Sequence, residues 1–303
     1  DRCARGSQLG QHGRDLVEQM LYGFGWRITA QHEGHQTRSL MLSTVDPAGA
    51  RFIVTCARGP SAAAESEEEA AEEEPLDHFA RAQVERHFEA HNGAQGIAVL
   101  GFETDELDAL HARYAALHHK LLASPEPRLY ADGTRVLDVY AYYTGEAKVS
   151  EADTGTLLRF VQRSEAAESD GDGGAPPLPP PLPGLVPVAA AFEPGVLAAY
   201  CDHWVSNVVS RVGFLQTLEE TLGFVPKVDF NAGVVAAGEA QIESTVTGNA
   251  SPLVTSNPAE ALRDTAQVFL PTNNALSPVG HVHWFLEQLG QGVQHVASRV
   301  GSL

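Results

Sequence analysis

The chain has 303 residues, 43% of them hydrophobic, and a formal net charge of −19, which fits one or two domains with real cores. The acidic charge excludes nucleic-acid binding, which needs clustered Lys and Arg against phosphates. No apolar run reaches about 18 residues, so we expect neither a membrane span nor a membrane partner.

The first half of the chain predicts an alternation of helices and strands. A helix from Arg14 ends at Gly23, and two strand-like runs follow, S-L-M-L-S and R-F-I-V-T-C. A second helix then leads through Gly96 into another strand. A helix at 106–122 and a strand pair ending in R-V-L-D-V-Y-A-Y-Y complete this half.

Two low-complexity segments interrupt the chain. The Glu/Ala-rich stretch at 61–75 is interpreted as a solvated insertion. The stretch at 165–187 contains P-P-L-P-P-P-L-P and predicts a stiff polyproline linker, with a ligand for a proline-reading domain as the alternative. The linker divides the chain into expected domains at 1–164 and 188–303.

The second half repeats the order of the first. A helix from Phe214 ends at Gly223, Q-I-E-S-T-V-T and Q-V-F-L-P predict strands, and a helix leads through Gly292 into a strand. The equal order and similar spacing predict a duplicated α+β module. Because the first module continues past this point and the second reaches Leu303, we expect a truncated second module and a chain incomplete at both ends.

The two modules differ where the last glycine meets the strand. The first has G-I-A-V, and the second has G-V-Q-H, which introduces Gln294 and His295. The second module also carries His203, after Asp202, at the predicted start of its first strand. A neutral imidazole is a good ligand for iron, zinc or nickel, so His203 and His295 are candidate metal ligands, with surface or core roles as the alternative. Four other histidines near helix ends are interpreted as non-ligands: His118, His119, His281 and His283.

An ordered set of short motifs carries a family resemblance. They are D-H-F at 77, H-N-G-A-Q-G at 91, L-D-V-Y at 137, L-P-G-L at 182, D-H at 202, V-S-N at 205, L-G-F at 222, E-S at 243, F-L-P-T-N at 269 and G-Q-G-V-Q-H at 290. In this order the chain resembles the 4-hydroxyphenylpyruvate dioxygenases of the vicinal-oxygen-chelate superfamily. The resemblance implies an α+β fold of two tandem βαβββ-type, glyoxalase-like modules, each a half-open β-barrel. The first module is expected to be metal-free, and the second, at 188–303, to be the iron-binding catalytic module.

The resemblance also implies a metal site. In this family two histidines and one glutamate bind iron(II) on one face, and His203 and His295 match the histidines. The glutamate belongs to late strands of the second module and is expected beyond Leu303. Glu243 does not match its position and is interpreted as an outward-facing strand residue.

Three polar residues match positions that line the substrate pocket in this family: Ser244, Asn273 and Gln294. The resemblance implies that they position the substrate. Ordinary strand-end or turn roles remain open for each, above all a turn at Asn273 beside Asn274.

The activity implied is conversion of 4-hydroxyphenylpyruvate and O₂ to homogentisate and CO₂ in tyrosine catabolism, with Fe(II) as cofactor and a small-molecule 2-oxo acid as partner. The alternatives are a related 2-oxo-acid dioxygenase such as hydroxymandelate synthase, and a catalytically dead scaffold or binding protein. Without the third ligand, little or no activity is expected of this chain alone. Three cysteines without a C-x-x-C pair favour a reducing, intracellular location, cytoplasmic or plastid, and a homo-oligomer is left open.

Overall fold

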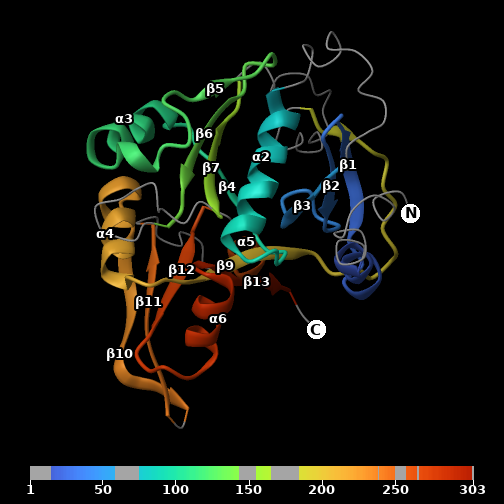
Figure 1. Cartoon of the computed structure of the whole chain (residues 1–303). Coiled ribbons are helices and arrows are strands. Elements are labelled where there is room, and N and C mark those ends of the chain that lie inside the picture. Colours follow the sequence, from blue (N-terminus) through green and yellow to red (C-terminus); the bar gives the residue numbers. More distant parts are fainter. Residues whose placement is uncertain are drawn as a thin grey trace. The chain divides into compact units, whose positions relative to one another are not determined.

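The computed structural model describes residues 15–58, 75–142, 155–164, 184–237, 239–249, 257–264 and 266–301. The predicted acidic insertion and polyproline linker lie almost wholly outside these residues. By spatial contacts the chain forms two compact units that interleave along the sequence (Figure 1). Unit 1 contains Asp1–Glu85, Gly173–Tyr200 and Arg299–Leu303, and unit 2 contains Arg86–Asp172 and Cys201–Ser298. These units group residues by their contacts in space, and they do not test the division into domains at 1–164 and 188–303, which stays a prediction.

Unit 1 is built on a four-stranded antiparallel sheet in the order β3-β2-β1-β8. Its strands are β1 (Arg27–Glu33), β2 (Thr37–Ser43), β3 (Arg51–Ala57) and β8 (Val186–Pro187). A π-helical turn, η2 (Gln19–Gly23), precedes the sheet, so the first predicted helix does end at Gly23. Trp26 is buried, with its ring 5.2 Å from that of Phe52, and Leu42 joins the same small core. The two strand-like runs of the first half are β2 and β3.

The first sheet of unit 2 has the order β4-β7-β6-β5. Its elements are β4 (Val99–Glu103), α3 (Leu107–Leu117), the 3-10 turn η4 (His119–Leu121), β5 (Arg128–Leu129), β6 (Arg135–Tyr140) and β7 (Leu157–Gln162). α2 (Pro75–Ala90) precedes β4 in the chain. β4 runs parallel to β7, and the other pairs are antiparallel. This strand, helix and three-strand order is one βαβββ repeat.

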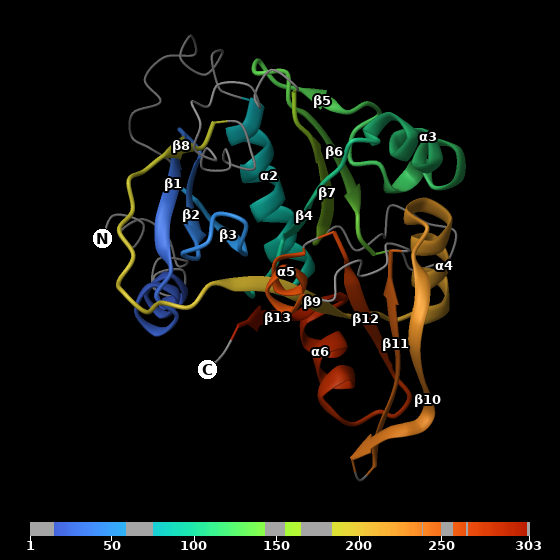
Figure 2. The same cartoon turned by 180° about the vertical axis from the view of Figure 1, so that it is seen from behind.

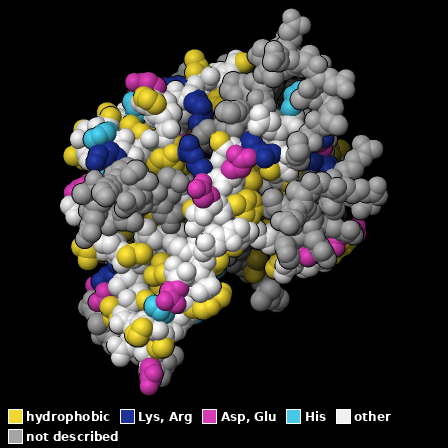
Figure 3. Space-filling view, in the orientation of Figure 1, with side chains coloured by type: hydrophobic (Ala, Val, Ile, Leu, Met, Phe, Trp, Pro, Cys, Tyr) yellow, Lys and Arg dark blue, Asp and Glu magenta, His cyan; other side chains and the backbone are white. Residues whose placement is uncertain are grey.

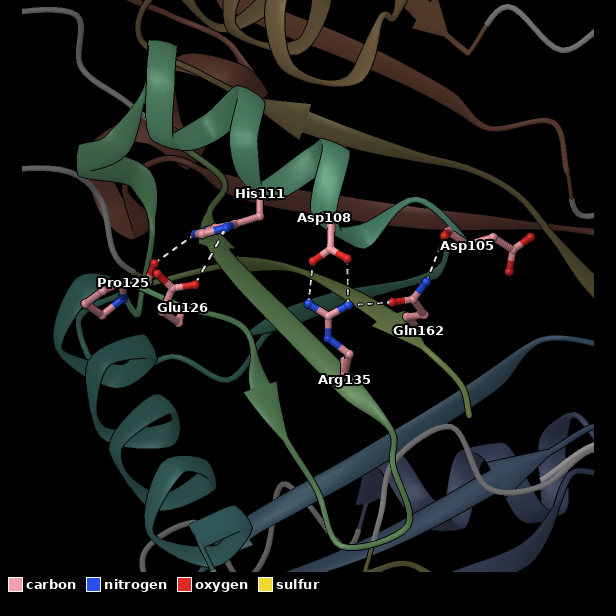
Figure 4. Close-up of polar contacts among 7 residues, drawn as sticks. All are labelled: Asp105, Asp108, His111, Pro125, Glu126, Arg135 and Gln162. Atoms are coloured by element: carbon pink, nitrogen blue, oxygen red, sulfur yellow. Dashed lines mark hydrogen bonds and ion pairs between the residues drawn. The ribbon is translucent and has the colours of Figure 1, made fainter. Parts of the chain in front are cut away.

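Polar contacts fasten α3 to this sheet (Figure 4). Arg135 on β6 makes a two-pronged ion pair with Asp108 at the start of α3, and its Nη1 donates to Asp108 Oδ2 over 2.9 Å. The same guanidinium donates to Gln162 Oε1, and Gln162 Nε2 donates to the carbonyl oxygen of Asp105. Hydrogen bonding from Arg135 holds the pKa of the Asp108 carboxyl below its usual range. The helix is therefore tied to β6 and β7 at its N-terminal end.

The second sheet of unit 2 has the order β10-β11-β12-β9-β13 (Figure 2). Its elements are β9 (Ala199–Asn207), α4 (Arg211–Leu222), β10 (Val225–Ala237), β11 (Ala240–Gly248), α5 (Pro258–Arg263), β12 (Phe269–Ala275), α6 (His281–Leu289) and β13 (Gly292–Val300). β9 is parallel to β12, as β4 is to β7. Apart from the short helices η4 and α5, the run β9-α4-β10-β11-β12 therefore repeats β4-α3-β5-β6-β7. The order η2-β1-β2-β3-α2-β4 also matches α4-β10-β11-β12-α6-β13, as the comparison of the two halves predicted. The predicted α+β fold of tandem modules is confirmed.

The helix stop at Gly223 is built by its backbone. Gly223 has a left-handed φ of 66°, which a residue without a Cβ adopts at low cost, and its N–H donates to the carbonyl oxygen of Glu219 over 3.0 Å. The chain then turns into β10. α4 packs its apolar face on the sheet, where Phe214 and Leu218 join Trp204 of β9 and Leu270 of β12 in the main core. One face of this sheet is thus apolar and covered by a helix.

Charges of both signs mix on the molecular surface. On the described part of the face in Figure 3, Lys and Arg side chains lie beside Asp and Glu. Independently of that view, Arg81 Nε and Glu85 Oε1 form an ion pair over 2.5 Å. Among the helices of the described ranges, we find none that is both long and apolar enough to span a bilayer.

Candidate functional site

The sheet order brings the two candidate metal ligands together. β9 and β13 are neighbours in the sheet, and the ring centroids of His203 and His295 lie 6.0 Å apart with their planes inclined by 73°. Two imidazoles bound to one ion through metal–nitrogen bonds of about 2.1 Å have centroids about 5 Å apart. The two rings are therefore about 1 Å further apart than two imidazoles that share one ion. The sequence predicted His203 at the start of a strand. β9 begins at Ala199, so His203 lies in the middle of this strand.

Neighbouring side chains fix how the two rings can be protonated. His203 Nδ1 lies 2.6 Å from Asp202 Oδ1, and His295 Nδ1 lies 3.1 Å from Gln294 Oε1. Both oxygens accept, so each neutral ring carries its proton on Nδ1. The Nε2 lone pair of each ring is then available to a metal, which is the usual arrangement for metal-bound histidine.

Electrostatics favour the neutral form of one of these rings. Burial, and to a lesser extent the nearby His203, lower the pKa of His295 below its usual value. Among the residues that the structure describes, no third His, Cys, Asp or Glu joins the pair. The Glu243 carboxylate instead accepts a hydrogen bond of 3.2 Å from Arg211 Nη2 at the start of α4. Glu243 is therefore committed to a structural ion pair.

Three polar side chains form a row across the same face as His203. Alternate residues of a strand share a face, so Asn207 on β9 lies on the side of His203. Asn207 pairs in register with Asn273 of β12, and Asn273 pairs with Ser244 of β11. All three are buried, and Asn273 Nδ2 donates to Asn207 Oδ1 over 3.2 Å. We call Asn207, Asn273 and Ser244 the polar row. The alternative interpretation of Asn273 as a turn residue is wrong, because it lies inside β12.

Asn207 was not predicted as a site residue. Its Nδ2 is buried and is one of the described side-chain atoms without a hydrogen-bond partner. A buried donor without an acceptor costs free energy, so this atom suits an acceptor group of a bound ligand. The signal in the sequence was its position four residues after His203, which on a strand means the same face.

Two further residues complete the description of the site. Gln294 contacts the His295 ring, which suits an orienting role, and its predicted contact with substrate stays a prediction. Phe230 of β10 pairs with Ser244 and is 36% exposed, so it extends the polar row with an aromatic side chain.

A cavity of about 210 Å³ lies elsewhere in unit 2, lined by Phe102, Arg113 and Phe224 among others.

The chain matches no protein-family model and no curated protein sequence. Among solved structures it is similar to a mutant of 4-hydroxymandelate synthase from Streptomyces coelicolor, with a TM-score of 0.59, 16% identity, and coverage of 94% of this chain and 66% of that one. It is also similar to a xylose isomerase-like TIM barrel/4-hydroxyphenylpyruvate dioxygenase fusion protein, with a TM-score of 0.50, 14% identity, and coverage of 97% and 35%. The chain shares its fold with these proteins. It spans just under two thirds of the length of the first and about a third of the second.

Proposed function

We propose that this chain carries two of the three metal ligands of an Fe(II)-dependent 2-oxo-acid dioxygenase, which converts 4-hydroxyphenylpyruvate and O₂ to homogentisate and CO₂ in tyrosine catabolism. The observation that carries the proposal is the approach of His203 and His295 from neighbouring strands, each with its Nδ1 occupied by an oxygen acceptor. The fold shared with two structures named for chemistry of this kind supports the choice of reaction.

The two histidines fit an iron ion as neutral nitrogen ligands. His203 and His295 would hold it, while Asp202 and Gln294 keep the rings oriented. Among the described residues no carboxylate joins this pair, and the family resemblance implies a glutamate as the third ligand. When bound, Fe(II) supplies the activation of O₂ that is coupled to loss of CO₂ from the 2-oxo acid.

The polar row would position the organic part of the substrate. Asn207 lies four residues from His203 along β9, about 13 Å in a strand, which favours an elongated ligand with polar groups at both ends. 4-Hydroxyphenylpyruvate has an acid at one end and a ring hydroxyl at the other. In this proposal Asn207 Nδ2 donates to the ring hydroxyl, Asn273 holds Asn207 in place, and Phe230 borders the ring. Fixed orientation of this sort lowers the entropy cost of reaction.

The test is anaerobic titration of the chain with 4-hydroxyphenylpyruvate, with and without Fe(II). We expect binding to require Fe(II) and to be lost in His203→Ala. Removing one hydrogen bond in Asn207→Ala should weaken binding about tenfold, because such a bond contributes about 1.4 kcal/mol. Asn274→Ala is the matched control, since Asn274 is the next residue after Asn273 on β12 and points to the other face.

A second ligand separates a direct contact from a general loss of structure. Phenylpyruvate lacks the ring hydroxyl, so it should bind the wild-type chain and Asn207→Ala equally. Binding of 4-hydroxyphenylpyruvate that ignores both Fe(II) and His203→Ala would contradict the proposal and favour a scaffold role.

A second candidate reaction forms 4-hydroxymandelate from the same substrate, and the fold shared with 4-hydroxymandelate synthase favours it. The two reactions differ in the carbon that is hydroxylated. Turnover by this chain with Fe(II) and O₂ would mean that it needs no further ligand, and the product, homogentisate or 4-hydroxymandelate, would decide between the two.

A further inference from the structure

A second pair of histidines lies apart from the candidate iron site. His87 lies in the last turn of α2 and His91 directly follows this helix, one helical turn later, and each residue is only 5% exposed. Their ring centroids are 4.3 Å apart with planes inclined by 42°. Two histidines at i and i+4 lie on one face of a helix, the spacing at which a helix can present two imidazoles to one metal ion.

Both rings use the same nitrogen for a structural contact. His87 Nδ1 donates to the carbonyl oxygen of Gly155 over 2.8 Å, and His91 Nδ1 donates to the carbonyl oxygen of Leu289 over 2.5 Å. A carbonyl oxygen only accepts, so Nδ1 carries the proton in each neutral ring. This contact fixes the ring orientation and leaves the Nε2 lone pair as the ligand, as in most protein metal sites.

Both Nε2 atoms are buried, and within the described residues neither has a hydrogen-bond partner. An unmatched buried acceptor costs free energy, and here two of them lie on adjacent rings. Burial lowers the pKa of His87 from 6.5 to about 4, so this ring is neutral and available as a ligand at physiological pH. A bound metal ion would satisfy both lone pairs.

Glycines border the two ligand atoms. A Cβ on Gly155 would lie 2.4 Å from His91 Nε2, and a Cβ on Gly96 would lie 3.1 Å from His87 Nε2. The backbone therefore packs closely against both Nε2 atoms, and a side chain added at Gly155 would push against His91 Nε2 without removing an imidazole.

We propose that His87 and His91 form a binding site for a divalent late transition-metal ion such as Zn²⁺, separate from the candidate iron site. Among the described residues no third His, Cys, Asp or Glu joins the pair, so the proposed site rests on these two imidazoles. The ion would stabilise the rings that contact Gly155 and Leu289, and so link α2, the start of β7 and the end of α6. The site would lie in the module that the family resemblance implies to be metal-free.

The experiment uses the chain with His203→Ala and His295→Ala, so that the candidate iron site does not take up Zn²⁺. Zn²⁺ binding is measured by competition with a chromogenic chelator and by the shift in Tm. We expect one Zn²⁺ per chain and a higher Tm. His91→Gln should weaken binding more than about 100-fold, beyond the loss typical of an orienting partner. Gly155→Ala, which keeps both imidazoles, should also weaken it.

His281→Gln is the control, because this histidine lies exposed on α6, and it should bind Zn²⁺ like the background chain. If His91→Gln fails to fold, the Zn²⁺ titration of the folded His203→Ala/His295→Ala chain still tests the proposal. The proposal is overturned if the His203→Ala/His295→Ala chain does not bind Zn²⁺. It is also overturned if His91→Gln and Gly155→Ala, made in that chain, both bind Zn²⁺ as tightly as that chain does. A buried water would then account for the two Nε2 atoms.

Discussion

Replacing His87 by glutamine should remove a defined part of the acid sensitivity of unfolding. The His87 ring is buried, and burial holds its pKa at about 4 in the folded chain, against 6.5 when it is exposed. The unfolded chain therefore takes up a proton on this ring at a higher pH than the folded chain does. The contribution of His87 to stability is complete above pH 6.5 and is lost as the pH falls toward 4.

The size of this effect follows from the two pKa values. One pKa unit corresponds to about 1.36 kcal/mol, so the full loss is about 3 kcal/mol. Between about pH 7 and pH 5 the folded ring stays neutral while the unfolded ring becomes protonated, which costs about 2 kcal/mol of unfolding free energy.

Urea unfolding at these two pH values measures the effect, with EDTA present to exclude metal ions. Wild-type chain should lose about 2 kcal/mol more than His87→Gln between about pH 7 and pH 5. His281→Gln, at an exposed histidine, should behave like wild type. Equal pH dependence in wild type and His87→Gln would refute the reasoning, because the ring would then titrate as it does in the unfolded chain.

Three further substitutions test the packing and the charges of unit 2. Gly223→Ala should cost about 1 kcal/mol in urea unfolding because of its left-handed φ, and Gly223→Asn should cost less; equal stability of all three chains would contradict the cap. Asp138→Asn should cost about 3–5 kcal/mol, because this fully buried carboxylate pairs with Arg159 over 2.7 Å; a loss below about 1 kcal/mol would mean that water reaches the pair. Arg135→Gln should raise the pKa of Asp108 toward its usual value in an NMR titration; an unchanged pKa would show that the ion pair does not form in solution.

Periodicity and glycine stops predicted much of the fold. Helices end at Gly23 and Gly223 as expected, and the alternating runs became β2, β3, β11 and β12. β10 was missed because V-P-K-V-D-F-N carries a proline and two charges. The strand accommodates Pro226 by a register shift against β11 before Val228, and only pairing with β11 reveals it as a strand.

The sequence predicted those residues of the candidate site that can be recognised from sequence motifs, and it missed those that come together only through long-range strand pairing. His203 and His295 could be paired because the two halves of the sequence repeat each other. Asn207 could not be joined to Asn273, because that requires the parallel register between β9 and β12, a contact between distant parts of the chain. The spacing of His87 and His91 is visible in the sequence, but their burial comes from tertiary packing.

Anaerobic equilibrium dialysis with Fe(II) tests most directly whether His203 and His295 hold a metal ion. His203→Ala and His295→Ala should each weaken Fe(II) binding more than about tenfold, because each removes one of two neutral nitrogen ligands. His281→Ala should keep the wild-type affinity, since this exposed histidine of α6 lies outside the proposed site. Wild-type Fe(II) affinity in both ligand variants would contradict the assignment of the site.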